Sequence, residues 1–294
     1  MPDRLARTLC PEARVRGLAA VTTDLVEEAR QRHDTLPTAT AALGRALTAA
    51  LLLGGLVKDD ERVSLQFSGD GPLGGILADA TPAGDVRGFV SRPQTHLPPR
   101  RGKLDVGGAL GRGLLCVMRV PLAGGTPYRS IVPLVSGEIG SDVASYLVRS
   151  EQTPAVVALG VFVEPDGRVG AAGGYVVQAM PGVEPGTIER LEGNVDAADA
   201  PSELVRQGLD PSAILLRLLA GFTTRTLEER PVRFHCRCDR TRVDRAILAM
   251  GKAELLDVLA GDRRAEVVCE FCAARYVVEE DELRALVAAS DGES

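Results

Sequence analysis

Two tight pairs of cysteines near the C-terminal end constrain this chain more than any other feature. Four of its six cysteines lie in the motifs Cys236-Arg237-Cys238 and Cys269-Glu270-Phe271-Cys272. A CxC or CxxC turn brings two sulfur atoms within a few ångström of each other, and two such turns supply the four thiolates of a tetrahedral zinc site. We therefore expect one zinc ion bound by Cys236, Cys238, Cys269 and Cys272 in the reduced protein.

We expect this zinc to be structural. A catalytic zinc keeps an open coordination position and usually has a His or carboxylate ligand, whereas this chain has only three histidines and no HExxH motif. His235 stands beside the first pair and is interpreted as a neighbour of the metal, not a ligand. The sequence predicts no catalytic residue and no site for an organic cofactor.

Zinc-bound thiolates also have redox chemistry, because the thiolate is the form of cysteine that attacks an oxidant or a disulfide. Metal binding and oxidation therefore compete for the same sulfur atoms. We expect four arginines in and after the first pair to favour the thiolates electrostatically: Arg237, Arg240, Arg242 and Arg245. Nearby acidic residues balance this charge and argue against a nucleic-acid-binding zinc ribbon: Asp239, Asp244, Glu266, Glu270 and residues 279–282.

The cysteine pattern resembles that of the heat shock protein 33 family of redox-regulated molecular chaperones. CxC, a spacer of about this length and CxxC stand at the end of a chain of similar size in that family. Three upstream segments are also similar to segments of the family: Gln66 to Pro72, Tyr146 with Ser150 to Pro154, and Ala171 to Gly174. The cysteine spacing is the most specific part of the resemblance, which extends over nearly the whole chain.

The resemblance implies an ATP-independent holdase, a chaperone that binds unfolding proteins without turnover. Oxidation is expected to join Cys236 to Cys238 and Cys269 to Cys272, release zinc and unfold the C-terminal region. A helical linker that covers the core domain in the reduced state would then loosen and uncover a surface for unfolded client proteins. The resemblance further implies a homodimer in the oxidised state.

Composition and charge limit the other classes of function. Hydrophobic residues make up 45% of the chain, enough to bury a sizeable core, and the net charge of −6 provides no basic field for nucleic acid or an anionic membrane. The N-terminal residues have no apolar signal-peptide core. The longest apolar run, Ala46 to Val57, is too short to span a bilayer. We expect a cytoplasmic protein, in a compartment where cysteine pairs are metal ligands or redox sensors more often than permanent disulfides.

The sequence predicts an α+β fold with three parts. Residues 1–180 are expected to form a mixed α/β core domain that binds clients, 181–230 a helical linker, and 231–294 a small zinc-binding redox-switch domain. In the core domain, a first strand is predicted at 14–22, a helix from Asp24 to about Arg32 with a capping box formed by Asp24 and Glu27, and a second helix from Pro37.

Period-two alternation begins at Arg62 and predicts a strand, and further strands are expected at 76–80, 86–90, 114–120 and 128–135. Ser141 is predicted to cap a helix that ends at Arg149. A hairpin follows, with strands at 156–163 and 168–180 around Pro165-Asp166-Gly167. In the linker, apolar residues from Ile214 to Phe222 form a stripe that is expected to dock on the core, and residues 243–259 are expected to be helical.

Two other motifs allow competing interpretations. Gly69 to Gly74 matches GxGxxG by letters, but a strand and not a helix follows it, so we interpret it as a glycine turn between strands. Residues 92–103 form a polar, proline-rich loop in which Arg100, Arg101 and Lys103 are interpreted as a solvated charge cluster.

Two alternative functions remain open for the cysteine motifs. A constitutive zinc-ribbon interaction module explains four cysteines but not the CxC spacing. A thiol-disulfide oxidoreductase that uses Cys269 and Cys272 would carry its CxxC at the start of a helix after an early strand. Cys10 and Cys116 stand alone and are interpreted as inert small apolar side chains.

Overall fold

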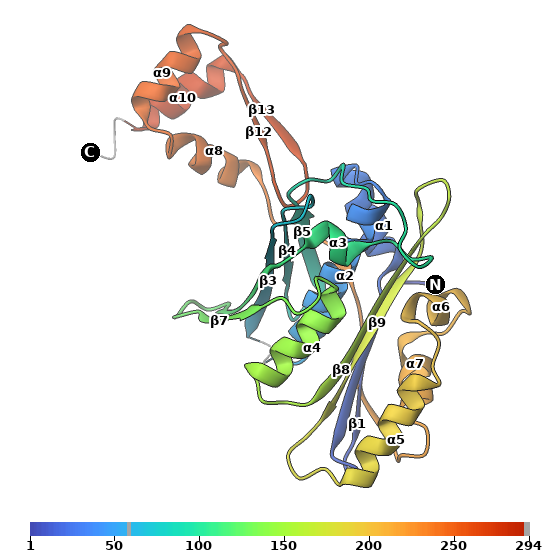
Figure 1. Ribbon diagram of the computed structural model, residues 1–294. Coiled ribbons are helices and arrows are strands. Elements are labelled where there is room, and N and C mark those ends of the chain that lie inside the picture. Colours follow the sequence, from blue (N-terminus) through green and yellow to red (C-terminus); the bar gives the residue numbers. More distant parts are fainter. Residues whose placement is uncertain (58–59, 291–294) are drawn as a thin grey trace. The chain divides into compact units, whose positions relative to one another are not determined.

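A single buried helix organises the larger part of the protein. The computed structural model describes residues 1–57 and 60–290 (Figure 1) and divides into two compact units, Met1–His235 and Cys236–Ser294. Helix α2 (Pro37–Gly54) contacts strands of both sheets of the first unit. Every residue of α2 from Thr38 to Gly54 is buried except Arg45. A helix with apolar residues on all sides is stable only when it is buried on all sides. The predicted start of this helix at Pro37 is confirmed.

The first sheet has five antiparallel strands in the order β10-β1-β2-β9-β8. Their bounds are β10 (Arg225–Pro231), β1 (Arg4–Cys10), β2 (Val15–Val21), β9 (Val169–Ala179) and β8 (Ala155–Val163). The predicted 14–22 strand and the predicted hairpin correspond to β2, β8 and β9. Strands β1 and β10 were not predicted, so the 14–22 strand is the second of the chain and not the first.

The second sheet has six strands in the order β11-β5-β4-β3-β6-β7. Their bounds are β11 (Arg233–Phe234), β5 (Asp85–Val90), β4 (Gly75–Ala80), β3 (Glu61–Gly69), β6 (Gly113–Pro121) and β7 (Tyr128–Pro133). The pairs are antiparallel except that β11 runs parallel to β5. All five strands predicted between Arg62 and residue 135 are present, with ends shifted by one or two residues.

The GxGxxG segment forms the turn between β3 and β4. The Gly69 amide donates to the Gly74 carbonyl at 2.8 Å, and Gly74 has φ of 78°, a conformation open to glycine at little cost. Strand β4 follows at once, so no helix N-terminus is available to hold a pyrophosphate. The prediction of a glycine turn is confirmed.

Two predicted helix caps are wrong. Helix α1 (Thr23–His33) begins with no side-chain cap of its own; instead the Asp3 carboxylate accepts hydrogen bonds from the Asp24 amide at 3.2 Å and the Leu25 amide at 2.7 Å. A residue just before β1 thus replaces the local capping box, which a sequence pattern cannot reveal. Helix α4 (Ile139–Arg149) begins before Ser141, and Glu138 occupies its N-cap position. The short helix α3 (Val106–Leu110) precedes β6.

Three helices after the core strands pack against the five-stranded sheet (Figure 1). They are α5 (Pro185–Asp196), α6 (Pro201–Arg206) and α7 (Pro211–Leu218). The predicted apolar stripe is buried on α7, where Ile214, Leu215 and Leu218 join one hydrophobic cluster with residues of β1, β2 and β9. Gly17 permits this close packing, because a Cβ added there would lie 2.8 Å from Leu215 Cδ2.

The second unit is small and has its own core. It comprises α8 (Arg240–Leu248), α9 (Lys252–Ala260), β12 (Ala265–Val268), β13 (Arg275–Val278) and α10 (Glu280–Ser290). The region predicted as helical at 243–259 is two helices, separated at Gly251, whose φ is 93°. The core contains six buried apolar residues: Val243, Ile247, Leu255, Leu259, Val278 and Leu283. A core of this size gives marginal stability by itself.

No helix among the described residues is both long enough and apolar enough to cross a membrane.

Candidate metal centre

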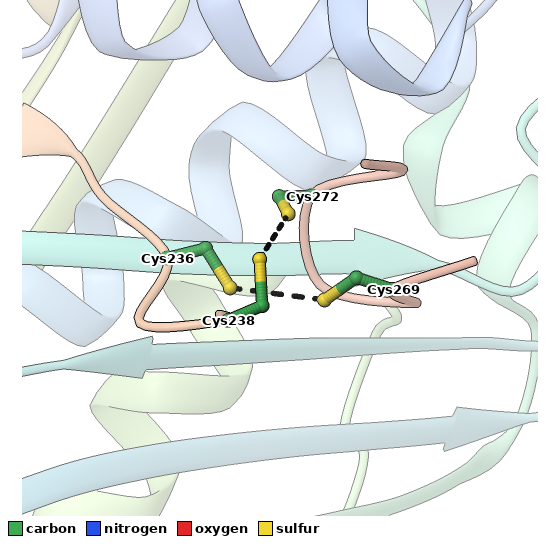
Figure 2. Close-up of side chains that lie close together, drawn as sticks. All are labelled: Cys236, Cys238, Cys269 and Cys272. Atoms are coloured by element: carbon green, nitrogen blue, oxygen red, sulfur yellow. Dashed lines mark hydrogen bonds between the residues drawn. The ribbon is translucent and has the colours of Figure 1, made fainter. Parts of the chain in front are cut away.

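The structure brings the four predicted cysteines together. Their sulfur atoms all lie within 4.8 Å of one another, and the four form the one cluster of candidate metal ligands found among residues 1–57 and 60–290. His235 is not part of that cluster. Two contacts between the motifs are drawn in Figure 2: Cys236 Sγ lies 3.8 Å from Cys269 Sγ, and Cys238 Sγ lies 3.3 Å from Cys272 Sγ.

The first cysteine pair leads directly into helix α8. Asp239 follows Cys238 and occupies the N-cap position, where its carboxylate accepts a hydrogen bond from the Arg242 amide at 2.8 Å. A capped helix start fixes the direction of the backbone that leaves the CxC turn. The cap therefore helps to fix the positions of the two cysteines that precede the helix.

The second cysteine pair forms the tight turn between β12 and β13. The Cys269 carbonyl accepts hydrogen bonds from the Cys272 amide at 3.3 Å and the Ala273 amide at 2.7 Å, while the Cys269 amide donates to the Ala274 carbonyl at 2.9 Å. Ala273 has φ of 55°, the left-handed conformation that reverses the chain. A CxxC motif in a hairpin turn differs from the strand-to-helix position that a thioredoxin-like enzyme uses.

Tyr276 on β13 extends the site beyond the cysteines. Its hydroxyl donates a hydrogen bond to Cys238 Sγ at 3.2 Å, and this contact raises the pKa of Tyr276 to about 12. The cysteine spacing did not predict this residue. Only the register of the hairpin, in which Tyr276 pairs with Val267, places it beside the cluster.

The thiols of the cluster differ in how readily they ionise. Burial is the largest cause that raises the pKa values of Cys269 and Cys272. Burial also opposes ionisation of Cys238, but hydrogen bonds from Tyr276 and from the neighbouring thiols outweigh it and lower the pKa of Cys238. Four thiolates at such close range repel one another, so full deprotonation of the cluster requires a bound cation.

The nearby arginines are not among the largest influences on the cysteine pKa values. The largest causes of the cysteine pKa shifts are burial, hydrogen bonds within the site and interactions between neighbouring thiols. Arg240 instead pairs with Glu282 at 2.6 Å and with Asp244 at 3.3 Å. Its charge is therefore already balanced by carboxylates.

The arrangement of sulfur atoms suits a tetrahedral metal ion. A zinc–sulfur distance of about 2.3 Å places the ligands of a regular tetrahedron about 3.8 Å apart. Two separations between the motifs are 3.3 and 3.8 Å, and all four sulfur atoms lie within 4.8 Å of one another. All four donors are sulfur, which favours soft and borderline metals over magnesium or calcium. The residues present therefore fit a closed, four-thiolate metal site.

The two remaining cysteines lie outside this site. Cys10 is fully buried in the hydrophobic cluster of the five-stranded sheet, and burial raises the pKa of its thiol. Cys116 is also buried, and its sulfur accepts a hydrogen bond from Arg129 Nε at 3.3 Å. Both are buried, as is usual for cysteines that act as small core side chains.

Comparison with known proteins gives consistent matches over the whole length. The family model described as Hsp33 protein matches residues 3–279. The 33 kDa chaperonin of Symbiobacterium thermophilum is 49% identical over 278 residues, which cover 94% of each chain, and that of Bacillus subtilis is 44% identical over 286 residues, 97% of this chain and 98% of the relative.

A solved structure has the same fold. The crystal structure of the 33 kDa chaperonin, or heat shock protein 33 homologue, of Thermotoga maritima superimposes with a TM-score of 0.93 at 36% sequence identity and covers 100% of both chains. The resemblance seen in the cysteine spacing is thus matched by sequence identity and fold along the entire length. The chain belongs to the Hsp33 family of chaperones.

Proposed function

We propose that this protein is a redox-regulated, ATP-independent holdase. In the reduced state, one zinc ion bound by Cys236, Cys238, Cys269 and Cys272 holds the C-terminal domain folded and the chaperone inactive. Oxidation joins Cys236 to Cys238 and Cys269 to Cys272, releases the zinc and unfolds the chain from about residue 231 onward. A surface that binds unfolding proteins then becomes exposed and prevents their aggregation under oxidative stress.

The observation that carries this proposal is the direction of the short sulfur contacts. Two short contacts run between the two motifs, with partners 33 and 34 residues apart in the sequence. A metal at the centre of the cluster therefore cross-links the start of the second unit to its β12–β13 turn. Disulfides within each motif would remove that long-range connection and leave two local loops.

The energies of the two states favour unfolding after oxidation. A structural zinc contributes roughly 10–16 kcal/mol of apparent binding energy in small metal domains, whereas a disulfide that closes so short a loop contributes on the order of 2 kcal/mol. The six buried apolar residues of the second unit cannot replace the difference. Loss of the metal is therefore expected to unfold this unit.

The segment before the cysteines offers a route by which this unfolding reaches the core. Strand β10 pairs with β1, and β11 pairs with β5, so residues 225–234 are hydrogen-bonded to both sheets. The His235 amide donates to the Val86 carbonyl at 2.8 Å, immediately before Cys236. Unfolding from about residue 231 would remove β11 and leave β10 without its following anchor.

We propose that the three segments predicted from the sequence have three separate roles. Residues 1–180 act as the client-binding core, 181–230 as the linker and 231–294 as the redox switch. Apolar side chains of α6 and α7 cover the five-stranded sheet, among them Leu204, Ile214 and Leu215. Their release would uncover contiguous apolar surface, which is unusual on a folded protein and binds the exposed apolar segments of unfolding clients.

The proposed setting follows from this chemistry. A thiol switch of this kind works in the cytoplasm, where thiols are kept reduced until oxidative stress. Clients are unfolded or partly unfolded proteins, and the active oxidised form is a homodimer. The activity consists of binding without turnover and involves neither nucleic acid nor membrane.

The direct test is suppression of aggregation. Light scattering of a heat-denatured test protein is followed in the presence of the reduced zinc-loaded chaperone and of the same preparation treated with peroxide at mildly elevated temperature. Suppression by the oxidised sample alone supports the proposal. Equal suppression by both samples, or by neither, contradicts it and favours a constitutive zinc-ribbon module.

A further inference from the structure

We propose that a basic cavity in the first unit binds an anion with two or more phosphate groups. The cavity has a volume of about 750 Å³, within the usual range for small-molecule sites. Its walls come from α2, from the loop before α3, from the segment before α4 and from β8. All of them belong to Met1–His235, so the site is distinct from the cysteine cluster.

Four cationic side chains line this cavity: Arg45, Arg100, Arg101 and Lys103. The two acidic residues of the lining are Asp105 and Glu138, and both already accept hydrogen bonds from protein groups. Asp105 caps α3 by accepting from the Gly108 amide at 2.8 Å. The Glu138 carboxylate accepts from Arg45 Nη1 at 2.5 Å and from the Gly107 amide at 3.3 Å. Positive charge therefore exceeds negative charge in the cavity by two.

Arg45 forms the inner wall and is the exception on an otherwise buried helix. Its side chain is 15% exposed, and its Nε atom is buried without a hydrogen-bond partner among the described residues. An unsatisfied buried guanidinium nitrogen is costly. Arg45 is fixed by Glu138 and lines the cavity, so its positive charge is well placed to attract an anion.

The other three cations are held at the cavity by a tight turn. Arg100 and Lys103 exchange both backbone hydrogen bonds, at 2.8 and 3.1 Å. Arg101 and Gly102, between them, have φ of 52° and 75°. Positive φ at both central positions defines a hairpin-type turn, which Asn-Gly or Gly-Gly would form with less strain than Arg-Gly. The strained position is therefore occupied by a guanidinium that lines the cavity.

Among the described residues, no carboxylate forms an ion pair with any of these three cations. The ion pairs formed within the described ranges include none by Arg100, Arg101 or Lys103, although most other arginines of the first unit have a carboxylate partner. Guanidinium groups bind phosphate oxygens in pairs, and their cationic charge favours multivalent anions. A cavity of about 750 Å³ also has room for more than one phosphate group.

A second cavity of about 300 Å³ adjoins the first and shares Arg45, Lys103, Leu104 and Leu159 with it. Its further lining is largely apolar and includes residues 160–163 of β8 and Ala200. Two sources of the phosphate chain are therefore compatible with the site: a free inorganic oligophosphate, or a nucleotide whose base enters the apolar cavity. Both have the same recognition chemistry at the basic wall.

The test is calorimetric titration of the reduced, zinc-loaded full-length protein with inorganic triphosphate and, separately, with ATP. The test variants are Arg100→Gln, Lys103→Gln and Arg101→Gly. The last removes the guanidinium and also relieves the positive φ, so its fold is retained. Arg263→Gly is the matched control, because Arg263 also has positive φ, 56°, and lies in the second unit.

We expect saturable binding that weakens with increasing ionic strength. Each substitution at the cavity should weaken it by about tenfold, the usual effect of losing one charge-assisted hydrogen bond, while Arg263→Gly has no effect. Tighter binding of ATP than of triphosphate identifies a nucleotide, and equal affinity identifies the phosphate chain alone. The proposal is wrong if neither ligand binds, or if Arg263→Gly weakens binding as much as Arg101→Gly. These titrations are independent of the redox switch.

Discussion

Cys238 and Cys272 lie 34 residues apart in the sequence, yet their sulfur atoms are 3.3 Å apart and each belongs to a different motif. The sulfur atoms of Cys236 and Cys269 are likewise 3.8 Å apart across the two motifs. The cluster therefore works as a tertiary cross-link when a metal is bound. This relationship determines which substitutions disturb the metal and which leave it intact.

Cys272→Ser is expected to remove most metal binding. Cys272 is 3% exposed, so serine would leave a buried hydroxyl in place of a thiolate ligand. Loss of a direct ligand should weaken zinc affinity by more than the roughly 10–100-fold that loss of an outer hydrogen bond causes. Competition with a chromogenic chelator measures the change. Cys269→Ser should behave alike, and both variants should be partly active and insensitive to oxidant.

The matched control for these variants is Cys116→Ala, because Cys116 is equally buried but lies outside the cluster. It should keep one zinc per chain. Full zinc affinity in Cys272→Ser would show that the ligand assignment is wrong.

Tyr276→Phe is expected to keep zinc but to make the site more sensitive to oxidation. The tyrosine hydroxyl donates to Cys238 Sγ at 3.2 Å, and a hydrogen bond to a thiolate lowers its nucleophilicity. Removing this hydrogen bond should speed peroxide-driven zinc release a few-fold. The absorbance of a zinc indicator, followed over time, measures the rate of release. Tyr128→Phe, in the first unit, is the control. Slower release in Tyr276→Phe than in the natural protein would contradict this role.

Leu215→Ala is expected to activate the chaperone without oxidation. Leu215 is 0% exposed where α7 packs on the five-stranded sheet, and truncating a buried leucine costs about 2–5 kcal/mol. The linker should loosen while zinc stays bound, so aggregation suppression should appear in the reduced state. Leu216→Ala is the matched control, because Leu216 is the next residue on the same helix and is 58% exposed. If the two reduced variants suppress aggregation equally, release of the linker does not activate the chaperone.

Glu27 is expected to contribute to stability at neutral pH but not in acid. Hydrogen bonds from Arg30, opposed in part by burial and joined by one from the Val169 amide, lower the pKa of Glu27 from 4.5 to about 2. Because the folded-state value is the lower one, this stabilisation is complete above about pH 4.5 and disappears as the pH falls towards 2.

Glu27→Gln should therefore reduce the free energy of unfolding at pH 7 by about 1–2 kcal/mol, allowing for partial solvent screening. Below pH 3 the variant and the natural protein should have similar stability. Urea unfolding at several pH values measures this, with Glu28→Gln, the neighbouring exposed carboxylate, as control. A difference between Glu27→Gln and the natural protein that does not change with pH would refute the assignment.

The elements that the sequence predicts well are those whose signals are local. Helix α2 follows from its proline start and its long apolar run, and the hairpin of β8 and β9 follows from the turn at residues 165–167. The four cysteines are equally local, because each motif is one turn. A single zinc ion needs four ligands, so the two turns must lie side by side to bind it.

The elements that it misses depend on partners far away in the chain. Strand β10 has the sequence RTLEERP, which lacks the alternation of a half-buried strand, and it is a strand because the edge of β1 is available to pair with it. The cap of α1 comes from Asp3, which precedes β1. Tyr276 is placed beside the cysteines by the register of its hairpin, and Arg45 is placed at its cavity by the packing of α2. Neither register nor packing can be read from a local residue pattern.

The central claim is that metal loss and activation are one event. The most direct measurement follows zinc release and aggregation suppression on the same sample during treatment with peroxide and mild heat, then adds reductant and zinc. The account predicts that both signals rise with the same time course and that both are reversed together. Zinc that stays bound while activity appears, or zinc that leaves without any gain in activity, would contradict it.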